Sequence, residues 1–143
     1  MKLILLAASA AAIAGPAPAQ APLPDVPLLA GATAAPDCGN LYGLAGKAFC
    51  VSAPLAAVGA LADAYVAELE GQGWLPAGGD DNRVVFVRRR DGGGCDGLQM
   101  QAFYDTSRPA GPQATGYLGF GVIPGDVCAA GQPGAGAAPE TQQ

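Results

Sequence analysis

The sequence predicts a disulfide-stapled α+β domain in the order β-α-β-β-β, with an antiparallel sheet of three to four strands and one amphipathic helix packed on one face. Three observations support this fold class. One stretch of apolar residues recurs at helical steps, several stretches have strand character, and the chain of 143 residues contains four cysteines. A chain of this length is typical of one domain.

The predicted helix begins after Ser52, a residue type that caps helix N-termini, and it tolerates Pro54 in its first turn. Its apolar residues return every three or four positions and form one stripe: Leu55, Val58, Leu61, Ala62, Tyr65, Val66 and Leu69. Gly71 or Gly73 can adopt the left-handed conformation that ends a helix. We expect Trp74 to fold back onto the core after that turn.

Strands are predicted on both sides of the helix, from β-branched and aromatic content and from alternation of apolar and polar residues. They are residues 47–51, 83–90, 98–104 and 115–123. Glycines at 92–94 predict a turn that joins the second and third of these strands as a hairpin. The sequence Gly-Asp-Asp-Asn at 79–82 predicts a turn rather than a cation-binding loop, because the spaced ligands of such a loop are missing.

The N-terminus predicts a cleavable signal peptide over residues 1–19. Lys2 precedes an apolar run at 3–14, and small residues at 17–19 suit cleavage before Gln20. The run is too short to span a membrane, which disfavours the alternative of an uncleaved anchor, and no later stretch in the mature chain is long enough. The Ala-rich apolar run, the absence of an N-glycosylation sequon and the modest size suggest a bacterial host, so we expect a protein that is periplasmic or secreted.

Composition sets the domain limits. Residues 20–36 are rich in Pro and Ala and predict a flexible or extended lead-in. Residues 129–143 are rich in Gly, Pro and Gln and predict a disordered tail. A single α+β domain is therefore expected over residues 37–128.

The four cysteines allow three disulfide pairings. They are Cys38, Cys50, Cys95 and Cys128. Their spacing and the absence of His disfavour a zinc site, so we expect no metal and no cofactor, and an oxidising compartment favours disulfides. If the last two strands place Met100 opposite Val122 and Ala102 opposite Phe120, Cys95 and Cys128 meet just beyond the strand ends. This favours the pairs 38–50 and 95–128.

The composition also bears on chemistry. A net charge of −5 disfavours nucleic acid as a partner, and the absence of His removes the commonest general base. Asp96, Asp105 and Asp126 could in principle supply a carboxylate pair for glycoside hydrolysis. Their spacing gives no sign of convergence, and roles in turns account for all three.

Two features suggest contact with a partner. Arg88 and Arg90 are expected on one face of their strand, either to protect a sheet edge or, with Arg108, to bind an anion or partner. The long loop at 105–113 is stiffened by two prolines, and we expect it near an apolar surface lined by aromatic residues that include Trp74 and Phe103. The candidate partner-binding residues are Arg88, Arg90, Asp105, Arg108, Tyr104 and Tyr117. Core filling and a tolerated insertion are the structural alternative for this loop.

These observations favour an exported non-catalytic binding or accessory domain that acts on a protein or cell-envelope component. A narrower form of this hypothesis is an inhibitor of a hydrolase. The alternative is a small secreted hydrolase that uses carboxylate or Tyr residues, and a third class is a structural envelope protein without a discrete site. The sequence makes no prediction of oligomeric state.

Overall fold

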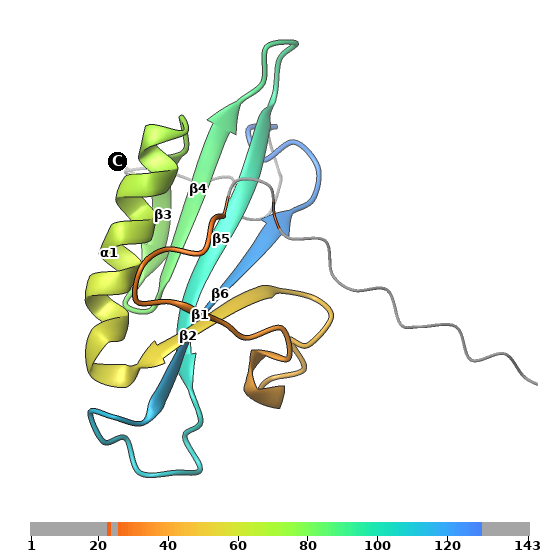
Figure 1. Ribbon diagram of the computed structural model, residues 1–143. Coiled ribbons are helices and arrows are strands. Elements are labelled where there is room, and N and C mark those ends of the chain that lie inside the picture. Colours follow the sequence, from red (N-terminus) through yellow and green to blue (C-terminus); the bar gives the residue numbers. More distant parts are fainter. Residues whose placement is uncertain (1–22, 24–25, 130–143) are drawn as a thin grey trace, which may run out of the picture.

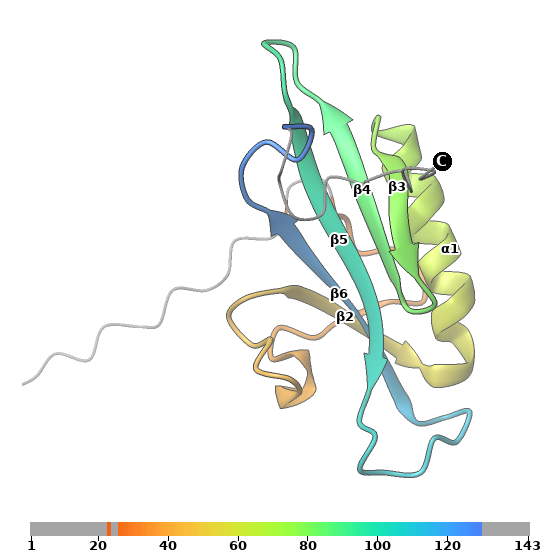
Figure 2. The same cartoon turned by 180° about the vertical axis from the view of Figure 1, so that it is seen from behind.

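A computed structural model describes residue 23 and residues 26–129 of the chain (Figure 1). In these residues one sheet has six strands, every neighbouring pair is antiparallel, and the strand order is β1-β2-β6-β5-β4-β3. The elements are β1 (Thr33–Ala34), the short 3-10 helix η1 (Cys38–Asn40), β2 (Phe49–Pro54), α1 (Leu55–Gly71), β3 (Leu75–Asp80), β4 (Arg83–Arg89), β5 (Cys95–Tyr104) and β6 (Thr115–Ile123). Helix α1 covers one face, so the α+β class is confirmed (Figures 1 and 2).

The predicted strand count of three to four is wrong, because the sheet has six strands. The sequence of β3, Leu-Pro-Ala-Gly-Gly-Asp, contains residue types that weaken strands. It forms an edge strand whose register with β4 shifts between Pro76 and Gly78, and all six of its residues are exposed. The turn predicted at 79–82 is therefore narrowed to Asp81 and Asn82, which connect β3 with β4.

The predicted pairing of the last two strands is wrong by two residues. Met100 faces Phe120, and Ala102 faces Leu118, rather than Val122 and Phe120. A shift of two leaves every side chain on its expected face, because side chains alternate with a period of two. The core pattern is therefore preserved, and the glycines that alternate along β6 explain why the register was weakly specified.

The start of α1 also differs from the prediction. Ser52 lies within β2 and does not cap the helix, whose cap position is taken by a proline without a side-chain hydrogen bond. Backbone carbonyls of the loop after β5 replace the side chain: Leu55 N–H donates to Ala114 O at 2.7 Å, and Ala56 N–H donates to Pro112 O at 3.1 Å. The loop is thereby tied to the helix at Leu55 and Ala56, two of the positions in the first turn where helix N–H donors lack internal partners.

The end of α1 follows the prediction with Gly73 as the terminating residue. Gly73 has a φ of +87°, and its N–H donates to Glu70 O at 3.0 Å. The N–H of Trp74 donates to Leu69 O at 3.0 Å, which completes the helix-ending motif that favours glycine. Trp74 is then 4 % exposed within the core.

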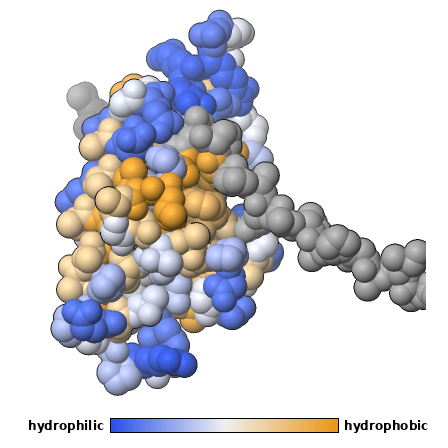
Figure 3. Space-filling model, viewed as in Figure 1, coloured by the Kyte–Doolittle hydropathy of each residue, from blue (hydrophilic) through white to orange (hydrophobic). Residues whose placement is uncertain are grey.

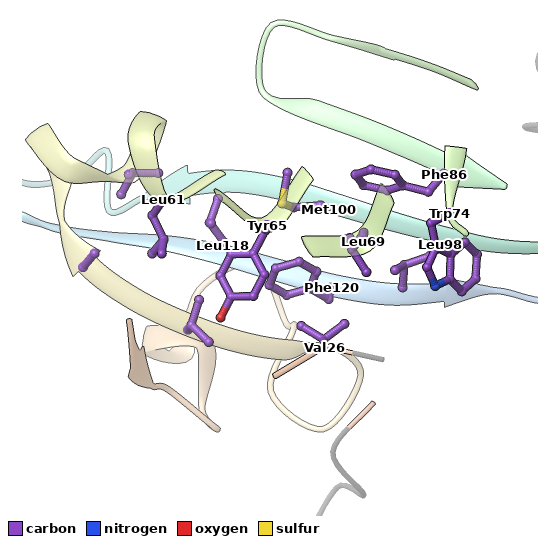
Figure 4. Close-up of a cluster of buried hydrophobic side chains, with 13 residues drawn as sticks. Val26, Leu61, Tyr65, Leu69, Trp74, Phe86, Leu98, Met100, Leu118 and Phe120 are labelled. Carbon is purple, nitrogen blue, oxygen red and sulfur yellow. The ribbon is translucent and has the colours of Figure 1, made fainter. Parts of the chain in front are cut away.

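The main core fills the space between α1 and the sheet (Figure 4). Its largest fully buried side chains are Tyr65, Phe86, Phe120, Leu69 and Leu118. The rings of Tyr65 and Phe120 lie 4.8 Å apart between their centroids. A second, smaller cluster on the other face of the sheet contains Ala35, Cys38, Ala48, Cys50 and Phe103.

Part of the segment assigned to a lead-in packs on the domain. Val26 is 3 % exposed and belongs to the main core, against which Leu29 also packs. The buried Tyr65 hydroxyl donates to Pro27 O at 2.9 Å and accepts from Leu29 N–H at 3.4 Å. The segment continues the layer formed by α1, and on this face Figure 3 shows an apolar area. Leu28, in this N-terminal segment, is 56 % exposed.

Both predicted disulfides are present. Cys38 pairs with Cys50, and Cys95 pairs with Cys128. The predicted signal peptide and all but the first residue of the predicted tail lie outside the described residues. Within the described part of the chain, no helix has the length and apolar character needed to cross a membrane.

Candidate functional site

A cleft of about 470 Å³ lies at the end of the sheet where β5 finishes and β6 begins. It brings together four of the six candidate residues, Tyr104, Asp105, Arg108 and Tyr117. Gly39 and Leu41, from the loop closed by the Cys38–Cys50 disulfide, also line it, together with Pro109, Gln113, Ala114 and Thr115. We call this the tyrosine cleft.

The disulfide loop forms one wall and is held in place by covalent and backbone contacts. The Cys38–Cys50 bond joins it to β2, and Asp37 Oδ1 accepts from Gly39 N–H at 3.0 Å. Gly39 has a φ of +65°, and a Cβ there would lie only 2.5 Å from the hydroxyl oxygen of Tyr117. Glycine is therefore required where the loop approaches this tyrosine.

The loop between β5 and β6 forms the other wall. Asp105 Oδ1 accepts from the Ser107 hydroxyl at 2.6 Å and from Ser107 N–H at 3.0 Å, while Oδ2 lies 3.2 Å from Arg108 Nε. The hydrogen bond from the Ser107 hydroxyl, followed by the one from its backbone N–H, holds the pKa of Asp105 below its usual range, and Arg108 lowers it further. With the two bonds to α1, these contacts fix both ends of the loop.

Stacked aromatic rings support the cleft from the face of the sheet opposite α1. The rings of Phe103 and Tyr117 stack with centroids 5.2 Å apart, and Tyr42 contacts Phe103 edge-on at 5.8 Å. The Tyr42 hydroxyl donates to Tyr104 O at 3.2 Å, so the disulfide loop is hydrogen-bonded to the end of β5. Sequence reasoning missed Tyr42, whose position in a glycine-rich loop was the available signal.

The other two candidate residues lie elsewhere. Arg90 binds Asp96 at 2.7 Å and donates to Cys95 O and Gly125 O at 3.1 and 2.8 Å. It therefore joins the β4–β5 turn to the loop of the second disulfide. The guanidinium of Arg88 lies 4.3 Å from the centroid of the Trp74 ring, on the face covered by α1. Neither arginine joins Arg108, and Trp74 does not line the tyrosine cleft.

The three aspartates considered for hydrolysis do not meet at one site: Asp105 lies at one end of β5, whereas Asp96 and Asp126 lie near the other, where Asp96 is paired with Arg90 and Asp126 accepts two backbone hydrogen bonds. Asp96 is at the start of β5, and Asp105 directly follows the end of this ten-residue strand. Asp126 lies near the start of β5, where its Oδ1 accepts from Cys95 N–H at 2.8 Å and from Cys128 N–H at 3.0 Å. The bond from Cys95 N–H lowers the pKa of Asp126 most, and the bond from Cys128 N–H lowers it further. Asp126 therefore has a structural role beside the disulfide.

One group has metal-like spacing among the described residues. Ligand atoms of Cys95, Asp126 and Cys128 lie within 4.8 Å of one another. The two sulfurs are bonded to each other and cannot act as thiolate ligands, so this group is a disulfide with a neighbouring carboxylate.

Comparisons with protein-family models, with curated proteins and with solved structures find no match to this chain.

Proposed function

We propose that this chain is an exported binding or accessory domain that holds part of a protein or cell-envelope component in the tyrosine cleft. The observation that carries the proposal is that two braced loops converge on one cleft with aromatic and charged side chains. Loops that are ordered before binding lose little conformational entropy when a partner arrives. The two disulfides are consistent with an oxidising compartment outside the cytosol.

The lining supports a role in recognition. Tyr104 and Tyr117 offer apolar rings with hydroxyl groups, a combination that gives large contact area at low entropic cost. Arg108 has 81 % of its side chain exposed and can contact a partner's acceptor while Asp105 orients it. The protruding loop between β5 and β6 also suits the narrower hypothesis of a hydrolase inhibitor, since such a loop can enter a partner's groove (Figure 1).

The same contacts favour binding over the hydrolase alternative. Asp105 is the carboxylate that lines the cleft, and both of its oxygens are engaged by Ser107 and Arg108. A general base near neutral pH needs a raised pKa, whereas the pKa of Asp105 is lowered. A carboxylate in this state suits the positioning of a loop.

Site-specific cross-linking in the producing cell tests this proposal. A photo-crosslinking amino acid replaces Arg108 in one variant and Ala67, on the exposed side of α1, in the control. We expect one dominant adduct from position 108 that is absent from position 67. The captured component, once purified, should bind the purified domain, and Tyr104→Ala should weaken its affinity by tenfold or more, on the order of 1.4 kcal/mol.

Two results would refute the binding proposal. One is the same set of adducts from both positions, because the cleft would then have no preferred partner. The other is turnover of a peptide or glycan panel by the purified protein that is lost in Asp105→Asn, which would support the hydrolase alternative instead.

A further inference from the structure

A trough of about 210 Å³ lies on the face of the sheet opposite α1, between the disulfide loop and the last residues of β6. Its floor is formed by Gln99 and Gln101 of β5 and by residues 119–123 of β6, and one wall by Leu44, Lys47 and Ala48 of the disulfide loop. We call this the glutamine trough. It shares no lining residue with the tyrosine cleft and is therefore a separate candidate site.

The floor contains a glycine, Gly121, that no contact within the described chain explains. Strands β5 and β6 contain four glycines, and an added Cβ at Gly97, Gly116 and Gly119 would lie 2.5, 2.5 and 3.1 Å from a neighbouring side chain. At Gly121 an added Cβ would meet nothing within 4 Å, the φ angle is not positive, and the pairing of β5 with β6 is regular. Glycine weakens the interior of a strand and often marks a position where a ligand or another backbone approaches closely. Gly121 therefore leaves room for a ligand in the trough.

Two glutamines of β5, Gln99 and Gln101, present hydrogen-bonding groups to this space. Both face a glycine across the ladder with β6, so no side chain stands opposite either of them. Gln99 Nε2 donates to Gln101 Oε1 at 3.3 Å. Within the described residues this is the one hydrogen bond that the two side-chain amides make, so Gln99 Oε1 remains as an acceptor and Gln101 Nε2 as a donor. One acceptor beside one donor is the complement of one peptide group.

The wall of the trough carries a positive charge. Lys47 is exposed, and no described carboxylate forms an ion pair with it. The lining contains no described Asp or Glu, whereas Leu44 and Ile123 offer apolar contact. The trough therefore suits a ligand that combines a carboxylate, a peptide group and a small apolar side chain.

From these observations we propose that the glutamine trough binds an N-acylated amino acid with a free carboxylate, the group found at the C-terminus of a polypeptide. Lys47 pairs with the carboxylate, Gln99 Oε1 accepts from the amide N–H, and Gln101 Nε2 donates to the acyl oxygen. The plane of the amide lies over Gly121. A cavity of roughly 150 Å³ holds benzene, so a volume of about 210 Å³ accommodates roughly eight or nine heavy atoms, the size of N-acetyl-L-alanine.

NMR titration of the ¹⁵N-labelled protein tests the proposal, with the backbone amide of Gly121 and the side-chain amide of Gln101 as reporters. Three probes share nearly the same shape: N-acetyl-L-alanine, N-acetyl-L-alaninamide, which lacks the negative charge, and O-acetyl-L-lactate, in which oxygen replaces the amide N–H. We expect saturable shifts with N-acetyl-L-alanine. Each of the other probes loses one interaction and should bind about fivefold more weakly or worse.

Three variants sharpen the test. Gly121→Ala places a methyl group where the amide lies and should weaken binding of N-acetyl-L-alanine by about tenfold or more without unfolding the domain. Gly111→Ala is the matched control, because its added Cβ also meets open space and Gly111 does not line the trough. Lys47→Gln keeps a long polar side chain and removes the charge, so it should bind N-acetyl-L-alanine and N-acetyl-L-alaninamide with equal affinity.

The peptide acetyl-Gly-Gly-Ala separates the two sources of this chemistry. Binding at least as tight as that of N-acetyl-L-alanine identifies the C-terminus of a polypeptide as the ligand. Weaker binding of the peptide, with the affinity for N-acetyl-L-alanine retained, identifies a free N-acylated amino acid.

Any of three outcomes would overturn the proposal. They are the absence of a saturable shift up to the solubility limit of N-acetyl-L-alanine, equal affinity of the unaltered protein for this probe and either of its two analogues, and full retention of binding in folded Gly121→Ala. None of these outcomes bears on cross-linking from Arg108, because the trough and the tyrosine cleft have no lining residue in common.

Discussion

Tyr65 joins the N-terminal segment to α1, and replacing it with Phe isolates the contribution of one hydroxyl group. The Tyr65→Phe change removes the bond to Pro27 O at 2.9 Å and the bond from Leu29 N–H at 3.4 Å, while the ring remains packed against Phe120. The change therefore leaves a partly buried carbonyl and a partly buried amide without their side-chain partner.

The structure gives an approximate size for the effect. Each hydrogen bond contributes about 0.5–1.5 kcal/mol net, so we expect the loss of both bonds to lower the free energy of unfolding by about 2 kcal/mol. At about 4 °C per kcal/mol for a domain of this size, the midpoint of thermal unfolding should fall by about 8 °C. Amide protection from hydrogen exchange should fall most in residues 26–34.

The pH dependence gives the same prediction a second test. Burial raises the pKa of the Tyr65 hydroxyl above its ordinary value of 10.0, although the bond from Leu29 N–H opposes the shift. A raised folded-state pKa means that the contribution is complete below pH 10 and is lost as pH rises through the folded-state value. The stability difference between the unaltered protein and Tyr65→Phe should therefore be constant up to pH 10 and shrink above it.

Urea unfolding followed by the fluorescence of the single tryptophan measures both effects. Tyr42→Phe is the matched control, because its ring is 64 % exposed and its one hydroxyl bond is made at the surface. We expect a change within about 0.5 kcal/mol for this control. Equal destabilisation by the two variants, or full protection of residues 26–34 in Tyr65→Phe, would refute the assigned role of Tyr65.

Three further predictions concern the second disulfide, its carboxylate and two glycines. Replacing Cys95 and Cys128 together by Ala opens a loop of 33 residues and should lower the free energy of unfolding by about 4 kcal/mol on chain-entropy grounds, measured by urea unfolding; an unchanged midpoint would refute this. Asp126→Asn should lower the free energy of unfolding at pH 7. The difference in this free energy between the variant and the unaltered protein should vanish as pH falls below 3.8 and through the lowered folded-state pKa of Asp126. A stability difference that persists in acid would contradict the structural role of Asp126. Gly73→Ala should lower the free energy of unfolding by about 1 kcal/mol, because Gly73 has a φ of +87°. Gly121→Ala should leave stability unchanged or raise it, because the space around the added Cβ is open. Equal losses of stability for the two variants in calorimetry would contradict both expectations.

The elements with a strong periodic pattern were the predictable part of the fold. The stripe of α1 and the alternation in β5 identify which side chains face the core, and the disulfide pairs follow from strand pairing. Cys95 pairs with Cys128 as predicted, although the predicted register of β5 and β6 is wrong by two residues. The reason is that Cys128 lies beyond the end of β6, after Pro124 and Gly125, where the backbone is not bound by the ladder.

Elements that depend on tertiary contacts were not predictable from local sequence. β3 contains Pro and Gly and becomes a strand because β4 pairs with it. The segment around Val26 has no period of its own, and its burial depends on contacts with Tyr65 and the main core, which are distant in sequence. Composition alone therefore underestimates how much of the N-terminal segment packs on the domain.

Four of the six candidate partner-binding residues lie in the tyrosine cleft and two lie elsewhere, for a similar reason. Tyr104, Asp105 and Arg108 are near neighbours in sequence, so one loop carries them to the same cleft. Arg88 and Arg90 were expected on one face of a strand that reaches residue 90. The strand ends at residue 89, so Arg90 leaves the alternation and turns toward the second disulfide loop.

The position of β6 between β2 and β5 has a consequence for the order of folding during synthesis. Cys50 in β2 faces Gly119 in β6, so the first long strand, which pairs on its other side with the two-residue β1, meets its long partner only when the last strand has been made. The loop closed by Cys38 and Cys50 can form early, whereas a nascent chain without residues 115–123 leaves one long edge of both β2 and β5 open. Pairing over such a separation slows folding and lengthens the time during which these edges can associate with other chains.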